Sequence, residues 1–177
     1  MKKLLFVALI AGLTLAADAQ NFAKLDGSPM DATYFPSRRE GAPKIRVLYS
    51  RPQKKGRDIF GGLVKYGAMW RIGANEATEI LFLTDAKVNG TDVKAGRYTL
   101  YAVPNETEWE VYISSDTDVW GHYAFDPGAS TVAKITVPTA KTEDTVEALS
   151  IAFEGVDDGA HLIIGWDDTM VRVPIEI

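Results

Sequence analysis

The sequence predicts an all-β protein that folds as a single antiparallel β-sandwich of about nine strands. Three observations lead to this prediction. Short segments of alternating apolar and polar residues recur along the chain, turn residues separate them, and no segment has a convincing helical period. A β-barrel is the alternative arrangement of the same strands. Because no linker, internal repeat or low-complexity tract divides the chain, we expect one domain over residues 45–177.

The first 19 residues are predicted to be a signal peptide. Lys2 and Lys3 precede the apolar run LLFVALIAGLTLA, and small residues stand at Ala17 and Ala19. The run is shorter than the roughly 20 residues that a membrane-spanning helix needs. The chain has no cysteine that could carry a lipid anchor. We therefore expect a secreted or periplasmic protein that begins at Gln20, with no membrane insertion after signal cleavage.

The first strand is expected only after an irregular arm. Residues 20–44 contain Gly, Pro, Ser and charged residues without periodicity. From Ile45 the pattern alternates, which places Ile45, Val47 and Tyr49 on one face of a half-buried strand. This strand is expected to end at Pro52, which removes a backbone donor.

The rest of the chain supplies the remaining strands. The pair Asn89-Gly90 is a strong signal for a tight hairpin, and the segments AGRYTLYAVP and WEVYI predict a second hairpin. Further strands are expected at VAKITVP, EALSIAFE, AHLIIGW and MVRVPIEI, with turn residues at Gly155, Asp157-Asp158 and Asp167-Asp168. The residues of the last strand that are expected to face the core are Val171, Val173, Ile175 and Ile177.

The stretch MWRIGANEAT, residues 69–78, breaks the alternation and concentrates polar side chains around a glycine. The Arg71 guanidinium is a planar, permanently charged fork that suits a carboxylate, phosphate or sugar-acid group. Trp70 could offer a stacking face for a sugar, and Asn75 adds donor and acceptor capacity. The sequence therefore predicts a ligand-binding site made of Arg51, Trp70, Arg71, Asn75 and Glu76.

A structural ion pair is the alternative role for the same stretch. If the chain is already extended at Glu76, this residue shares a face with Thr78 and Ile80, and its carboxylate lies near the core. A carboxylate there must be paired or must have a raised pKa, since burying it unpaired costs several kcal/mol. Arg71 or Arg51 is the expected partner, and the pair would pin the loop without any ligand.

The segment SRPQKKGRD adds a basic cluster to an otherwise acidic protein. Its four basic residues are Arg51, Lys54, Lys55 and Arg57. The cluster either draws an anionic ligand toward Arg71 or is a solvated turn that needs no partner.

Composition and motifs argue against several other function classes. The net charge of −5 disfavours nucleic acid and anionic membranes as partners. Two histidines without cysteines do not predict a zinc site. Asp116 and Asp118 lack the rest of a calcium-loop pattern, and the chain has no GxSxG nucleophile elbow. We therefore assign no catalytic residue, no metal and no cofactor.

Three blocks of sequence carry a family resemblance. They are YSRPQKKGRDIFGGLVKYGAMWRIGANEAT (residues 49–78), VKAGRYTLYAVPNETEWEVYI (residues 93–113) and DTDVWGHYAFD (residues 116–126). Together they resemble the secreted bacterial family catalogued as domain of unknown function 2911 (DUF2911), over roughly residues 26–177. The resemblance implies a secreted or periplasmic β-rich domain with no established activity. His122 departs from the small or polar residue expected there in relatives, which argues against a catalytic role for it.

Three functions follow from these residues. The leading one is non-catalytic binding of a small polar, anionic or sugar-like ligand, or of a partner, through the Trp70–Glu76 loop. The second is a hydrolase of envelope or dietary polymers that uses Glu76 and a second carboxyl group across a cleft. The third is a structural or assembly module in which Arg71 and Glu76 form an internal clamp.

Overall fold

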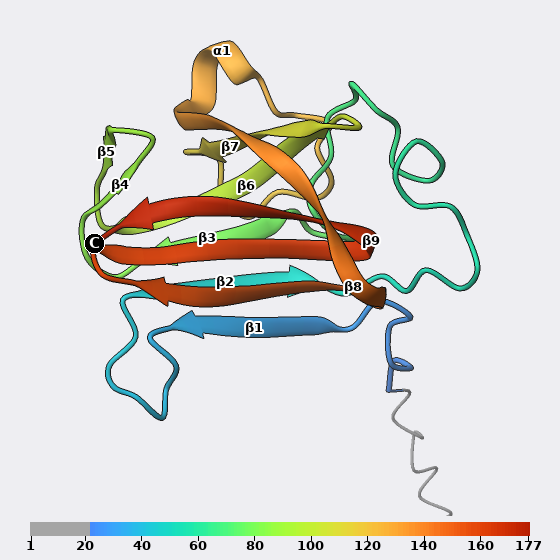
Figure 1. Ribbon diagram of the computed structural model, residues 1–177, viewed down its shortest axis with the longest axis horizontal. Helices are drawn as coiled ribbons and strands as arrows, with labels where there is room; N and C mark the ends of the chain where they lie inside the picture. The colour runs from blue at the N-terminus through green and yellow to red at the C-terminus, as the bar shows by residue number, and fades with distance from the viewer. Residues whose placement is uncertain (1–21) are drawn as a thin grey trace, which may run out of the picture.

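The computed structural model describes residues 22–177, and nearly all of its regular elements are β-strands (Figure 1). The predicted signal peptide, residues 1–19, lies outside the described residues. The one helix within residues 22–177 is α1 (Pro127–Ser130), and no helix in that range is long and apolar enough to cross a membrane. The strands are β1 (Met30–Phe35), β2 (Ile45–Ser50), β3 (Thr78–Phe82), β4 (Ala86–Val88), β5 (Thr91–Val93), β6 (Gly96–Pro104), β7 (Glu108–Ser114), β8 (Thr131–Val156) and β9 (Gly159–Glu176).

The nine strands form one continuous antiparallel sheet in the order β1-β2-β3-β6-β7-β8-β9-β4-β5. β1 and β5 are its two edges and do not pair with each other, so the sheet is not closed into a barrel. The predicted antiparallel sandwich is confirmed, and the barrel alternative is wrong. The predicted hairpin at Asn89-Gly90 is also confirmed, because it joins β4 to β5 with φ values of 51° and 73°.

The long strand β8 connects the two layers of the sandwich. Residues 131–138 pair with β7, whereas residues 139–156 pair with β9, and Figure 1 shows β8 running diagonally before it turns back. β9 itself doubles back at Asp167, whose φ of 58° lies in the left-handed region. Its two halves approach so closely that a Cβ on Gly159 would collide with the carbonyl oxygen of Ile175. Such a contact leaves room only for glycine.

The predicted irregular arm, residues 20–44, is wrong in part, because it contains β1. This strand pairs with β2 along its whole length, from Met30 opposite Ser50 to Phe35 opposite Ile45. β1 is an edge strand whose first two residues are exposed and whose other residues are only half-buried. An edge strand of this kind needs no strict apolar alternation, so periodicity gave no signal for it.

The apolar faces predicted from alternation form the core. The inward residues of β2 and of the end of β9 are buried, namely Ile45, Val47, Tyr49, Val171, Val173 and Ile175. At one end of this core, the rings of Phe60, Trp70, Trp109 and Trp166 pack together, with centroid separations of 4.9 to 6.2 Å. Trp109 is fully buried. This aromatic cluster supports the end of the sandwich that carries the candidate site.

Candidate functional site

The loop of residues 51–77 joins β2 to β3 and projects from one end of the sandwich, drawn in teal and green in Figure 1. A cleft of about 610 Å³ opens along this loop, a volume typical of small-molecule sites. The residues that line the cleft come from three other places as well: the chain just before β1, the loop after β7, and the turn within β9. They are Gly27, Ser28, Pro52, Gln53, Lys55, Arg57, Leu63, Val64, Lys65, Ala68, Met69, Trp70, Arg71, Gly73, Ala74, His122 and Trp166.

Trp70 anchors the loop to the sheet. Its backbone N–H donates to the carbonyl of Ala102 in β6 at 2.8 Å, and its carbonyl accepts from the Ala102 N–H at 2.9 Å. Its ring is 6% exposed and stacks on Trp166 at an interplanar angle of 17°. The structure therefore does not favour the predicted stacking of a sugar on Trp70, because this residue is buried and Trp166 already covers one face of its indole ring.

Two residues after Trp70 the backbone takes up a strained conformation. Ile72 is fully buried and has a φ of 54°, in the left-handed region that β-branched residues avoid. The Thr78 hydroxyl donates to the carbonyl of Ile72 at 2.6 Å, and the Thr78 N–H donates to the carbonyl of Arg71 at 3.1 Å. Such a conformation costs about 1–3 kcal/mol and persists only where the surroundings hold it, which is often at functional sites.

The side chain of Arg71 lies in the cleft without a partner. Its Nε atom is buried and makes no hydrogen bond to any described residue. The expected ion pair between Arg71 and Glu76 is wrong: Glu76 is exposed, and neither residue forms a salt bridge within residues 22–177. The left-handed Asn75, with a φ of 60°, turns the chain before β3 begins at Thr78, so Glu76 does not continue the inward face of that strand.

Arg51 and Asn75 lie outside the cleft lining. The Arg51 guanidinium forms an ion pair with Asp31 of β1 at 2.9 Å and donates to the carbonyl of Leu149 and the hydroxyl of Ser150 in β8. It therefore ties the edge of one layer to the other layer. The carbonyl of Asn75 accepts a hydrogen bond from the Gly121 N–H at 3.0 Å. Both residues hold elements that surround the cleft.

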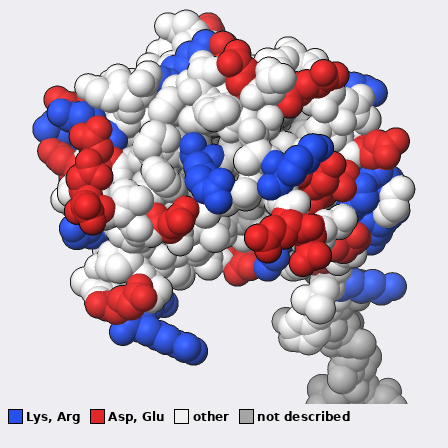
Figure 2. Space-filling model, in the orientation of Figure 1, with Lys and Arg blue, Asp and Glu red and all other residues white. Residues whose placement is uncertain are grey.

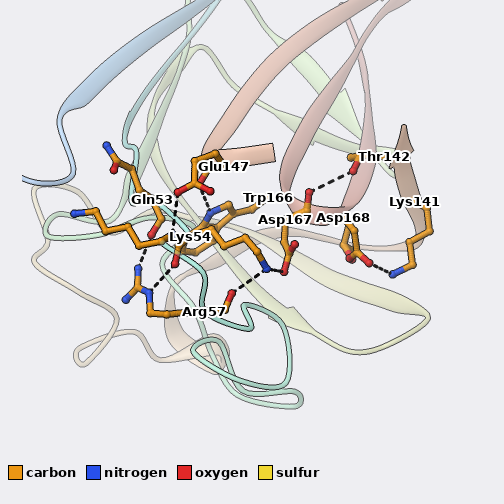
Figure 3. A network of polar contacts seen from close by, with 11 residues as sticks. Gln53, Lys54, Arg57, Lys141, Thr142, Glu147, Trp166, Asp167 and Asp168 are labelled. Atoms are coloured by element: carbon orange, nitrogen blue, oxygen red, sulfur yellow. Dashed lines mark hydrogen bonds and ion pairs between the residues drawn. The ribbon is translucent and has the colours of Figure 1, made fainter. Parts of the chain in front are cut away.

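The basic residues after β2 have two different roles: Lys54 forms structural contacts, whereas Lys55 and Arg57 line the cleft. Lys54 forms an ion pair with Asp167 at 2.6 Å, and its carbonyl accepts from Arg57 Nε at 2.9 Å (Figure 3). Figure 3 also shows Glu147, whose carbonyl accepts from Trp166 Nε1 and from the Lys54 N–H. These contacts fix the segment to β8 and β9. The expected solvated turn is therefore wrong for Lys54, whereas Arg57 is exposed and its guanidinium bonds only to backbone carbonyls of the same segment.

The charge in the cleft is uniformly positive. Lys55, Arg57, Lys65 and Arg71 line it, and none of them forms an ion pair with another described residue. No Asp or Glu stands among the lining residues, although the chain as a whole carries a net charge of −5. Four cations without an ion-pair partner in residues 22–177 thus line one cleft of an acidic protein, three of them exposed to solvent and Arg71 partly buried.

His122 is a cleft residue that sequence reasoning set aside. Its Nδ1 atom is buried and has no hydrogen-bond partner in residues 22–177. Burial lowers the pKa of His122, and the nearby Arg71 guanidinium lowers it further. No spacing in the sequence links residues 71 and 122. They meet because the backbones of residues 75–77 and 119–121 pair, through the hydrogen bonds from Ala77 to Val119 and from Gly121 to Asn75.

A comparison with models of protein families tests the family resemblance that the three sequence blocks suggested. The model of the family described as protein of unknown function (DUF2911) matches residues 28–175. The chain belongs to this family. Neither curated proteins nor solved structures give a match. The part of the chain that matches DUF2911 includes every residue that lines the cleft except Gly27.

The hydrogen bond from Thr78 to Ile72 is expected to hold the strained loop of this DUF2911 domain. Thr78→Val keeps the shape of the side chain but leaves the buried Ile72 carbonyl unpaired, so we expect a loss of about 1–3 kcal/mol in the free energy of unfolding. Urea unfolding measures this loss. Thr131→Val is the matched control, because the Thr131 hydroxyl is buried without a partner and its removal should be neutral or stabilising. Equal losses in the two variants would contradict the role given to Thr78.

Proposed function

We propose that this DUF2911 domain is a non-catalytic binding module for a small anion, which Arg71 and His122 hold in the cleft. One observation carries the proposal: the cleft contains two buried nitrogen atoms without partners, Arg71 Nε and His122 Nδ1, among cations and without a lining carboxylate. The predicted signal peptide supports the further proposal that the domain works in the periplasm or outside the cell.

The unpartnered nitrogens favour an acceptor-bearing ligand. Leaving a buried donor unpaired costs about 1–3 kcal/mol, so buried polar groups in proteins are nearly always satisfied. An anion such as a carboxylate, phosphate or sulfate can accept from the guanidinium of Arg71 and from a protonated His122 together. Hydrogen bonds between charged groups are roughly twice as strong as neutral ones. The same anion would offset the mutual repulsion of the four cations.

The distribution of charge favours a small ligand over a polymer. Figure 2 shows acidic and basic side chains interspersed over the face that it displays. A nucleic acid needs a continuous basic track along its phosphates. The uncompensated cations of the cleft are instead gathered around about 610 Å³, which matches a single small molecule.

Neither of the other two functions is favoured by a specific observation. Hydrolysis between two carboxyl groups needs both of them at one cleft, yet Glu76 is exposed and is not part of the cleft lining. The internal clamp needs an ion pair between Arg71 and Glu76, and that ion pair does not form. Arg71 is therefore better explained by a ligand than by an internal partner.

Replacing Arg71 tests the proposal. Arg71→Gln should weaken binding of sulfate or succinate about 10- to 100-fold, because one charge-assisted hydrogen bond contributes about 1.5–3 kcal/mol. Isothermal titration calorimetry measures the dissociation constants. Arg172→Gln is the control, since Arg172 lies exposed on β9, pairs with Glu154 and does not line the cleft. The proposal fails if the two substitutions weaken binding equally, or if the wild-type protein binds neither anion.

Binding should also depend on pH through His122. In the free protein, burial and Arg71 keep the pKa of His122 below its ordinary value. A bound anion favours the imidazolium and raises this pKa, so binding takes up a proton. Affinity is therefore highest below the pKa of the free protein and falls as the pH rises through the pKa of the complex.

Sulfate titrations between about pH 5 and 8 measure this dependence, because sulfate, lysine and arginine keep their charges over that range. The wild-type affinity should fall toward high pH, and His122→Gln should remove the dependence. If the variant retains the wild-type profile, another group takes up the proton and His122 does not contact the anion.

A further inference from the structure

Two large aromatic side chains beside His122 are exposed to solvent. Trp120 is 65% exposed and Tyr123 is 80% exposed. Trp120 is the exception among the four tryptophans of this chain, and exposed aromatic surfaces often mark an interaction site. Trp70, Trp109 and Trp166 are all buried in the same molecule.

The backbone holds these aromatic residues in place. Trp120 forms an antiparallel bridge with Glu76, and the flanking hydrogen bonds from Ala77 to Val119 and from Gly121 to Asn75 are both 3.0 Å long. The segment that carries Trp120 is therefore fixed to the same loop that places Arg71. An exposed side chain on an anchored backbone loses less conformational freedom when a ligand orders it.

The ring of Tyr123 is placed by Gly121. The φ of Gly121 is 74°, and a Cβ on this residue would collide with the Tyr123 ring, so glycine allows the ring to lie against the backbone. The Tyr123 ring also packs near the imidazole of His122, with a centroid separation of 4.9 Å. The aromatic surface is thus continuous with the cleft at His122.

Trp120 does not itself line the cleft, but it lies close along the chain to His122, which does. Only Gly121 stands between Trp120 and His122, so the Cα atoms of these two residues are at most about 7 Å apart. The cleft also has an apolar wall, because Leu63 lines it and is 49% exposed. The cleft therefore has cations and an apolar residue in its lining, and the exposed Trp120 and Tyr123 lie beside its lining residue His122 in the chain.

We infer that the anion bound by this DUF2911 domain is a sugar acid, whose carboxylate enters the cleft while its pyranose ring stacks on Trp120. This inference rests on the proposed function, and it assigns Trp120 as a binding residue in place of the buried Trp70. The ligand must carry an acidic group and a flat apolar face in the same molecule.

The chemistry of a pyranose ring fits the open position of Trp120. The C–H groups on one face of the ring form an apolar surface that packs against an aromatic ring. The hydroxyl groups around the edge of the ring keep their bonds to water, which a platform open to solvent permits. The acidic substituent of the same sugar supplies the acceptor that Arg71 and His122 lack.

Three probe molecules distinguish the contribution of the sugar ring to the binding affinity from that of the negative charge. Glucuronate has both a pyranose ring and a carboxylate, gluconate has the carboxylate on an open chain, and glucose has the ring without the charge. Calorimetry on the wild-type protein should show glucuronate binding about fivefold more tightly than gluconate, as expected for one aromatic stacking contact. Glucose should bind far more weakly than either acid.

Substitution of Trp120 then tests the assigned contact. In Trp120→Ala the two acids should bind equally, and Trp120→Tyr, which keeps an aromatic face, should restore part of the preference for glucuronate. Because Trp120 is exposed, neither substitution should change the melting temperature by more than a few degrees.

The outcomes distinguish the ligand class from the anion site itself. If glucuronate and gluconate bind equally to the wild-type protein and both are lost in Arg71→Gln, the ring inference is overturned while the anion site stands. Tighter binding of uridine monophosphate than of glucuronate would assign the ring to a nucleobase and overturn the carbohydrate class. If neither acid nor sulfate binds, the proposed function fails together with this inference.

Discussion

The packing of Trp70 against Trp166, Trp109 and Phe60 is the interaction that the functional end of the molecule depends on. Each aromatic ring of this kind buries roughly 150–250 Å², which corresponds to about 4–6 kcal/mol of apolar transfer free energy at most. The cluster joins the 51–77 loop to Trp109 of β7 and Trp166 of β9, two strands that are far apart in the sequence. The loop is also held on the sheet by its buried residues Ile59, Val64 and Ile72 and by its hydrogen bonds.

The position of Arg71 follows from this anchor, because it is the next residue along the chain. Its main chain is fixed on one side by the bridge from Trp70 to Ala102 and on the other by Thr78. The next residue, Ile72, has the strained left-handed backbone. The fold holds a costly backbone conformation and leaves the buried Nε atom of Arg71 unpaired among the described residues, two features that reduce stability and are expected where a protein keeps a site ready for a ligand.

The sequence predicted those elements whose pattern is local. The inward faces of β2 and β9 and the Asn89-Gly90 hairpin follow from alternation and turn chemistry within a few residues. β1 escaped prediction because an edge strand is only half-buried. The roles of Trp70 and His122 could not be predicted, because each depends on a partner distant in the sequence: Trp166 covers Trp70, and the pairing of residues 75–77 with 119–121 brings His122 to Arg71. The prediction that Glu76 lies on the inward face of β3 was wrong, because the left-handed backbone at Asn75 changes the direction of the next side chain.

The proposed function depends most directly on one contact, in which Arg71 Nε donates a hydrogen bond to an anion in the cleft. The most direct measurement follows the arginine Nε–H signals in nitrogen–proton correlation spectra while sulfate is added to the wild-type protein. We expect a saturable shift of the Arg71 signal, while the signal of Arg172, on the exposed face of β9, stays in place. If all arginine signals shift together with ionic strength and none saturates, the cleft binds no anion and the proposed role of Arg71 is wrong.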